Sequence, residues 1–298
     1  MKVFVTGATG FVGSAVVDEL VAAGHEVVGL ARSADGAAAV IAAGAQARRG
    51  DLADLDGLRE AAAAADAVVH TAFVHDFSAF AASAETDRRA IEALGEALVG
   101  SDRPLVVSAG TAGLAPGRLA TEDDAPGEGS PRVSEQTALA FADRGVRAIA
   151  LRLPPSVHGE GDHGFVPRAI EIARETGVAG HPGDGAQRWA SVHRRDAARL
   201  YRLALGSAPA GSVLHAVADE GVPVREIAEV VARHLDLPVQ GVPTEHFGWL
   251  GMFLAMDMAA SSALTRKRFA WAPTEIGLLA DLEAGHYFRE TATSAMRG

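Results

Sequence analysis

The chain has 298 residues and a formal net charge of −11 at pH 7, and it contains no cysteine. This length is sufficient for a nucleotide-binding α/β domain with a smaller companion. The missing cysteines exclude disulfides and thiolate metal sites, and no metal site is expected. Nucleic acid and anionic membranes need clustered positive charge, which is absent here, so a small uncharged or cationic substrate fits the composition better.

The N-terminal sequence leads from a short apolar run directly into a glycine turn at Gly7. An export signal would need a longer apolar stretch. We therefore expect a cytoplasmic location.

Residues 1–155 alternate short apolar runs with helical stretches, such as 12–23, which Gly24 ends as a C-cap. This alternation predicts an α/β fold in which a Rossmann-type, doubly wound parallel sheet binds a dinucleotide. The expected strands are 3–6, 27–31, 45–48, 67–70, 105–108 and 148–153.

After Pro154-Pro155 the pattern breaks into shorter pieces rich in glycine, proline and histidine. We expect a smaller substrate-binding region over residues 156–298. Two of its segments, 191–193 and 213–217, are candidates to return to the first sheet. The apolar stretch 247–258 is too short to span a bilayer and contains Asp257, so a place in the core is expected.

A glycine motif lies where the first strand turns into the first helix. Gly7 permits the tight turn, Gly10 lets the backbone approach a phosphate, and Gly13 lets helix and strand pack closely. The amides at the helix start then face a pyrophosphate with a favourable dipole. The predicted cofactor-binding residues of this motif are Gly7, Thr9, Gly10, Phe11, Val12 and Gly13.

The end of the second strand indicates which nicotinamide cofactor is used. An acidic residue there would bind the ribose 2′-hydroxyl, but the position holds Ala31. Arg32 and Ser33 follow, and both are suited to binding a 2′-phosphate. The sequence therefore predicts NADP(H).

These residues resemble the extended, epimerase/dehydratase-like branch of the short-chain dehydrogenase/reductase family, and the resemblance covers nearly the whole chain. It implies that Asp51 and Leu52 contact adenine, and that Thr71 and Ala72, with Phe73 after them, lie beside the cofactor ribose. It also places Ser108 and Pro154 at the cofactor. Later landmarks of the same resemblance are 154–159, 188–196, Trp271-Ala272-Pro273 and Gly277-Leu278. It further implies a homodimer formed through helices flanking the sheet.

The family's usual catalytic pair, a tyrosine four residues before a lysine, is missing. Alignment puts Pro131 at the tyrosine position and Glu135 at the lysine position. The only tyrosines are Tyr201 and Tyr287, and neither has a lysine four residues after it. The chain thus resembles atypical members of the family that lack this pair.

Three residues remain as candidate catalytic groups. Ser108 is a candidate hydrogen-bond donor to the reacting atom, although a serine at a strand end also serves to bind backbone. His158 and His163 follow the sixth strand and are candidate general acids, although a histidine at such a position is more often a loop-forming or pocket-lining residue. Tyr287 reaches the site only if the C-terminal segment folds back over it. Ser134 and Glu135 together predict the start of a helix, with a serine cap followed by an acidic first turn.

The leading hypothesis is NADPH-dependent reduction of a C=O or C=N bond of a small organic substrate. An iminium substrate is favoured because it already carries its proton and a positive charge, so hydride transfer to it would need no strong acid. A non-catalytic NADP(H) sensor is the alternative from another class, and a sugar-nucleotide-type epimerase or dehydratase is a weaker one.

Overall fold

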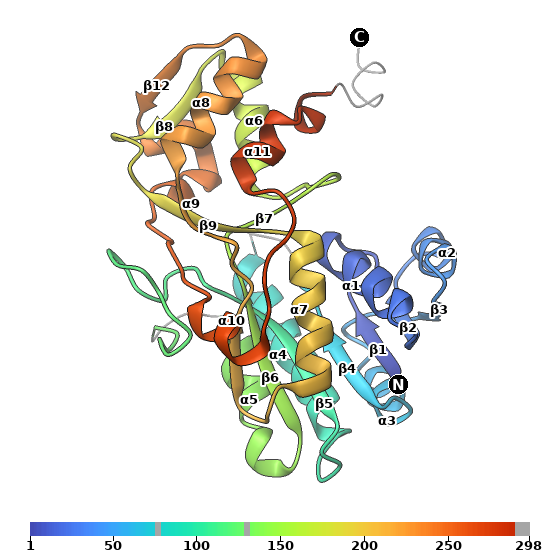
Figure 1. Cartoon of the computed structure of the whole chain (residues 1–298). Coiled ribbons are helices and arrows are strands. Elements are labelled where there is room, and N and C mark those ends of the chain that lie inside the picture. The colour runs from blue at the N-terminus through green and yellow to red at the C-terminus, as the bar shows by residue number, and fades with distance from the viewer. Residues whose placement is uncertain (75–78, 128–131, 290–298) are drawn as a thin grey trace.

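The computed structural model describes residues 1–74, 79–127 and 132–289. Figure 1 shows two layers of structure along the long axis of the molecule: a large sheet with helices around it, and a smaller group of helices and short strands. Among the described residues, no helix is both long enough and apolar enough to cross a membrane.

The main sheet has seven strands in the order β10-β6-β5-β4-β1-β2-β3, and every neighbouring pair in it is parallel. This arrangement confirms the predicted Rossmann-type fold. Its strands are β1 Lys2–Thr6, β2 Glu26–Ala31, β3 Gln46–Arg49, β4 Ala67–His70, β5 Pro104–Gly110, β6 Arg147–Leu153 and β10 Ser212–His215.

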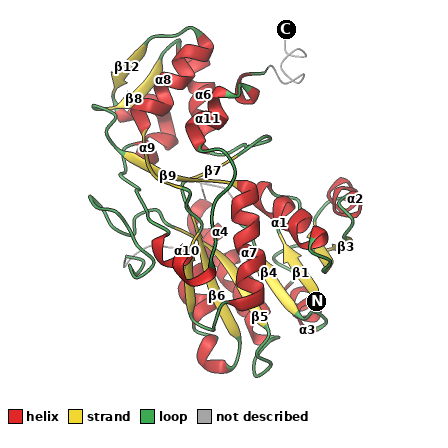
Figure 2. Cartoon of the chain, in the orientation of Figure 1, coloured by secondary structure: helices red, strands yellow, loops and turns green. Residues whose placement is uncertain are grey.

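Helices cover both faces of this sheet, because its strands are apolar on both sides. One apolar core joins the sheet to α1 and α7, which pack against each other, and the other joins it to α3, α4 and α5 (Figure 2). The helices of this layer are α1 Phe11–Ala22, α2 Ala34–Ala42, α3 Leu55–Ala63, α4 Phe80–Glu96, α5 Ser134–Leu139 and α7 Arg194–Ser207, with the short helix η2 at Ala142–Arg144.

The smaller layer has its own apolar core around Trp189 and Leu250. It contains a three-stranded sheet in the order β11-β9-β7 and a two-stranded sheet, β12-β8. Its strands are β7 Ser156–His158, β8 Ala179–Pro182, β9 Arg188–His193, β11 Asp219–Pro223 and β12 Val239–Val242. Its helices are α6 Phe165–Thr176, α8 Val224–Leu235, η3 Thr244–Leu250, α9 Gly251–Leu254, α11 Leu278–Glu283 and η4 His286–Phe288, and α10 Ala263–Phe269 lies beside the main sheet.

The six strands predicted from the sequence all form, with ends that differ by at most two residues. Gly24 follows the first helix with φ of +80°, as a C-cap glycine should. Of the two later segments considered for the main sheet, only the one around β10 joins it. Residues 191–193 belong to β9, which pairs with β7 and β11 in the second sheet instead.

Candidate functional site

A cleft of about 1590 Å³ runs along the carboxyl ends of the main strands and under the smaller layer. The strand order reverses between β1 and β4, which is where open α/β sheets bind ligands. The cleft therefore lies where the fold favours a dinucleotide.

The glycine turn between β1 and α1 forms the floor of this cleft. Gly7 has φ of +69°, and a Cβ there would lie 2.7 Å from the amide nitrogen of Ala72. A Cβ on Gly13 would lie 2.0 Å from the Gly7 carbonyl oxygen. Gly10 precedes the first helical residue, so the amides at the start of the helix are open to the cleft. The turn has the shape and amide donors that a diphosphate requires, and Thr9, Phe11 and Val12 line the cleft beside it.

The cleft continues past the ends of β2 and β3. Arg32, Asp51 and Leu52 line it there. Ser33 is not among the lining residues, because its hydroxyl caps α2 by accepting the Gly36 amide at 3.0 Å. Arg49, which the sequence analysis did not single out, donates from Nη2 to the Arg32 carbonyl at 3.0 Å. Arg32 thus lines this end of the cleft, and Arg49, which lines a neighbouring hollow, is bonded to it.

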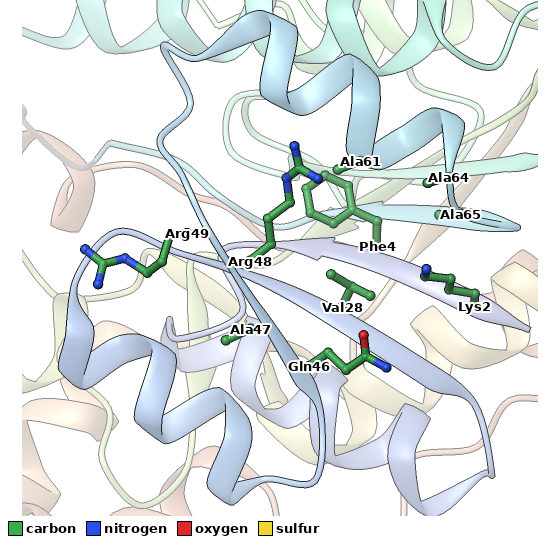
Figure 3. Close-up of a pocket in the computed structure, with 10 residues that line it drawn as sticks. All are labelled: Lys2, Phe4, Val28, Gln46, Ala47, Arg48, Arg49, Ala61, Ala64 and Ala65. Atoms are coloured by element: carbon green, nitrogen blue, oxygen red, sulfur yellow. The ribbon is translucent and has the colours of Figure 1, made fainter.

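A second hollow, of about 430 Å³, lies on the other side of β3. Figure 3 shows that Arg48 and Arg49 point in different directions, as successive strand residues do. Arg48 lies over Phe4 and pairs with Glu60 of α3 at 2.6 Å. Because this hollow faces α3, it is separate from the glycine turn.

At the end of β4, Thr71, Ala72 and Phe73 line the cleft. The Thr71 hydroxyl donates to the Thr6 carbonyl at 2.8 Å, which fixes this segment against β1. The guanidinium of Arg132 lies over the Phe73 ring, 4.1 Å from its centroid. The sequence analysis missed Arg132, which stands next to Pro131, a residue outside the described ranges.

The Ser108 side chain is bound within the protein. Its hydroxyl donates to the His70 carbonyl at 2.8 Å, and the Tyr201 hydroxyl lies 2.6 Å from it. Since the single hydroxyl hydrogen of Ser108 is used on His70, Tyr201 is the donor of the second bond. Burial raises the pKa of Tyr201, so it stays a neutral phenol. Ser108 borders the cleft, but its hydrogen is not directed to a substrate in this arrangement, so a catalytic role for Ser108 stays a prediction.

A buried chain of polar groups connects β1 to Arg132. Thr6 Oγ1 lies 2.8 Å from His70 Nδ1, and His70 Nε2 lies 3.0 Å from Asp87 Oδ1. The Ser134 hydroxyl donates to Asp87, and Arg132 Nε donates to Ser134 Oγ at 3.0 Å. Burial alone would raise the pKa of Asp87, but the His70 hydrogen bond and the charges of His70 and Arg132 hold it below its usual value. Asp87 is therefore a carboxylate that helps to keep Arg132 in place.

Glu135 lies in the first turn of α5, as the sequence predicts, but the helix has no serine cap. Ser134 is bound to Asp87 rather than capping α5. Glu135 receives two hydrogen bonds from Arg152, each at 2.6 Å, and both side chains are almost fully buried. The simple cap predicted from the sequence is wrong, because a buried arginine 17 residues away needs this carboxylate as its partner.

The two candidate histidines differ in their access to the cleft. His158 is fully buried and does not line the cleft, and its Nδ1 lies 2.9 Å from Asp281 Oδ2. A buried ring in this position does not reach a substrate, so the structure does not support His158 as the acid. His163 is exposed, lines the cleft and lies edge-on to Phe11 at 5.8 Å between ring centroids. Its role as an acid stays a prediction.

Tyr287 reaches the cleft, because the C-terminal segment folds back over the loop after β7. Its hydroxyl donates to Asp162 Oδ2 at 3.1 Å and accepts the Gly159 amide at 3.2 Å. Burial raises the pKa of the Asp162 carboxyl and also that of Tyr287. Asp162 is thus an acidic group of the cleft wall held by a residue 125 positions later.

Aromatic side chains form the outer wall on the side of the smaller layer. The Phe165 ring lies 4.8 Å from Phe253 and 5.9 Å from Trp249, measured between centroids. All three line the cleft, and Trp249 is 45% exposed. Pro154, at the end of β6, borders the inner part. The cleft therefore combines a polar inner end with an aromatic outer wall.

Comparison with known proteins agrees with this geometry. The chain is 50% identical to an uncharacterised protein of Schizosaccharomyces pombe, with 97% of this chain and all of that protein covered. It is 32% identical to a 2-alkyl-3-oxoalkanoate reductase of Stenotrophomonas maltophilia, with 80% and 77% covered. A solved dTDP-glucose 4,6-dehydratase of Streptomyces venezuelae, with NAD bound, superposes with a TM-score of 0.78 at 22% identity, covering 96% of both chains. The sequence model of the NAD dependent epimerase/dehydratase family matches residues 3–216, and the chain belongs to that family.

Proposed function

We propose that the protein is an NADP(H)-dependent reductase that reduces the C=O bond of a small organic substrate. The observation that carries this proposal is the continuity of one cleft. It starts at the glycine turn and extends past the ends of β4, β5 and β6 into a hollow bordered by Arg132 and the aromatic wall. A nicotinamide cofactor bound there would supply the hydride.

The residues of the cleft fit such a cofactor. The turn can pack closely against the segment at Thr71 and Ala72 because Gly7 and Gly13 have no Cβ. The amides that follow Gly10 would hold the diphosphate, and Leu52 would border the adenine. Thr71 and Ala72 would border the ribose on the reactive side.

NADP(H) rather than NAD(H) is proposed because of the charges at the end of β2. Ala31 leaves no carboxylate to bind a ribose 2′-hydroxyl or repel a 2′-phosphate. Arg32 and Arg49 are both exposed there and joined by a hydrogen bond. Two guanidinium groups suit a phosphate dianion.

The charge of Arg132 favours a carbonyl substrate over an iminium. Arginine stays protonated at neutral pH even though burial lowers its pKa here. A protonated guanidinium stabilises the negative charge that develops on a carbonyl oxygen. The ketone reductase among the relatives supports the same choice.

The test is isotope transfer from stereospecifically 4-deuterated NADPH to a panel of ketones and cyclic imines, followed by mass spectrometry of the products. We expect deuterium in alcohols derived from ketones and little in amines. Incorporation only into amines would reverse the choice of substrate. Inertness toward every ketone and imine, with cofactor bound, would remove the reductase proposal.

One observation favours a second function, a non-catalytic NADP(H) sensor. The hydroxyls of Ser108 and Tyr201 are used on each other and on backbone, so neither is presented to a substrate. Calorimetric titration with NADPH and NADP⁺ separates the two functions. A sensor would bind the two forms with clearly different affinities and turn nothing over.

A further inference from the structure

We infer that Arg194 is a positioning residue for the dinucleotide: it fastens the loop 159–164 across the start of α1 and thereby slows release of the cofactor. This loop connects β7 to α6, and its residues 161–164 line the cleft. The inference rests on the binding of a nicotinamide dinucleotide at the glycine turn, which the proposed function also requires. It does not depend on the reaction that is proposed.

Arg194 lies where the two layers of the molecule meet. It is the first residue of α7, which packs against α1 in the main layer. The residue before it, His193, ends β9 of the second sheet and pairs with His158 of β7. Because the loop begins directly after β7, this pairing brings the start of the loop to Arg194. A Cβ on Gly159 would lie only 3.3 Å from Arg194 Cγ.

The Arg194 side chain extends from the loop to α1. Its Nη1 donates to the Glu160 carbonyl at 3.3 Å, and its Nη2 donates to Ser14 Oγ at 3.4 Å. Its guanidinium lies over the Phe11 ring, 4.8 Å from the ring centroid. A single side chain therefore contacts the loop, the first residue of α1 and a residue one turn further along that helix.

These contacts lie beside the expected position of the diphosphate. Phe11 directly follows Gly10, so its amide is one of those at the helix start that face an anion in the cleft. The loop packs on the same residue, because the His163 ring lies edge-on to the Phe11 ring. A cofactor held under this loop would leave faster when the loop moves away from α1.

The other side of the loop is bound by the smaller layer. The Tyr287 hydroxyl accepts the Gly159 amide and donates to Asp162. The hydrogen bonds of Arg194 link the same loop to α1 of the main layer. Arg194 therefore holds the two layers together at the place where the cofactor enters the glycine turn.

The positive charge of Arg194 also favours an anion at the start of α1. Among the described residues it forms no ion pair, and Asp18 acts on it only from a greater distance. Burial lowers the pKa of Arg194, but an arginine stays protonated at neutral pH. A test must therefore separate the effect of its contacts from the effect of its charge.

The experiment measures how fast NADPH leaves the protein. Protein loaded with NADPH is mixed with an excess of NADP⁺ in a stopped-flow instrument, and the change in NADPH fluorescence gives the dissociation rate. Arg194→Gln should raise this rate about tenfold and change the association rate by less than about threefold. Arg194→Lys should recover part of the loss, because an ammonium can still lie over the Phe11 ring.

Arg195→Gln is the matched control for charge. Arg195 is the next residue of α7, carries the same charge and is exposed, and this variant should keep the wild-type dissociation rate. Gly159→Ala disturbs the same contact from the side of the loop, since its Cβ would also lie 2.9 Å from His193 Nε2. It should raise the dissociation rate as well. Its control is Gly211→Ala, where φ is also positive but the Cβ meets nothing within 4 Å.

Hydrogen exchange measured by mass spectrometry reports on the loop itself. With NADPH bound to both proteins, the amides of residues 159–164 should exchange faster in Arg194→Gln than in the wild-type protein. Equal exchange in the two proteins would show that Arg194 does not fasten the loop.

A wild-type dissociation rate in Arg194→Gln would overturn the inference. An equal increase in Arg195→Gln would also overturn it, because the effect would then come from charge alone. If Arg194→Gln fails to fold, the comparison of Gly159→Ala with Gly211→Ala decides. Normal NADPH binding with unchanged rates in the variants would refute only this inference, whereas a wild-type protein that binds neither NADPH nor NADH would refute the proposed function as well.

Discussion

At the diphosphate end of the cleft, Gly7, Gly10 and Gly13 lie close together in the chain, in the turn after β1 and the first turn of α1. At the substrate end, Ser108 meets Tyr201 from 93 positions away, and Asp162 meets Tyr287 from 125 positions away. The diphosphate end depends on local backbone geometry, whereas the substrate end depends on side chains that are far apart in the sequence. Substitutions should therefore affect the two ends in different ways.

The largest effect on cofactor binding is expected from Gly13→Ala. The added Cβ would lie 2.0 Å from the Gly7 carbonyl oxygen and 2.7 Å from Thr71 Oγ1, so the turn must move. NADPH affinity measured by calorimetry should fall roughly 100-fold, equivalent to about 2.7 kcal/mol. Gly206→Ala in α7 is the control, because its Cβ meets nothing within 4 Å. Wild-type affinity in Gly13→Ala would contradict the role given to the turn.

The largest effect on stability is expected from Glu135→Gln, which removes the charge opposite Arg152 at the substrate end. Removing one partner of a buried ion pair costs about 3–5 kcal/mol, which denaturant unfolding would detect. Glu60→Gln, which breaks the surface pair with Arg48, should cost less than about 1 kcal/mol. The folded fraction of Glu135→Gln should still bind NADPH with normal affinity. A large loss of cofactor affinity would mean that the two ends are not separable.

Tyr201→Phe should have a smaller effect, about 1–2 kcal/mol of the unfolding free energy, because one buried hydrogen bond is lost. Ser108→Ala should cost a similar amount, and the double variant should cost less than the sum, since both remove the same bond. Additive losses would refute the pairing. If Ser108 were instead the donor to the reacting oxygen, Ser108→Ala would reduce kcat far more than Tyr201→Phe does.

The smallest effect concerns the adenosine end. Arg49→Ala should weaken NADPH binding about five- to tenfold and leave NADH binding unchanged, because only NADPH carries the 2′-phosphate. Arg48→Ala is a matched control from the adjacent position on the opposite side of β3. Calorimetric titrations of both cofactors measure this difference. Equal losses for NADPH and NADH in Arg49→Ala would show that its role is structural.

The sequence predicted those features that depend on residues close together in the chain. Strand periodicity and glycine spacing predicted the main sheet and the turn, since both depend on residues close in the chain. Ser33 shows the limit even there, because its place in the sequence did not reveal that its hydroxyl caps α2. Its contact with a 2′-phosphate stays a prediction.

At the substrate end, local patterns were insufficient. Nothing in the spacing of Arg132 indicates that it stacks on Phe73, 59 positions earlier. Glu135 looked like an ordinary first-turn acid until β6 placed Arg152 beside it. Such contacts follow from the order of strands in the sheet, which single-sequence patterns do not specify.

The bond between Tyr287 and Asp162 has a consequence for how the protein is made. A ribosome synthesises the glycine turn first and residue 287 almost three hundred codons later, so the cradle for the diphosphate exists before the wall opposite it is complete. Nascent chains stalled before Tyr287 would hold the loop after β7 without its phenol partner. Asp162 thus gains this partner only long after the glycine turn has been synthesised.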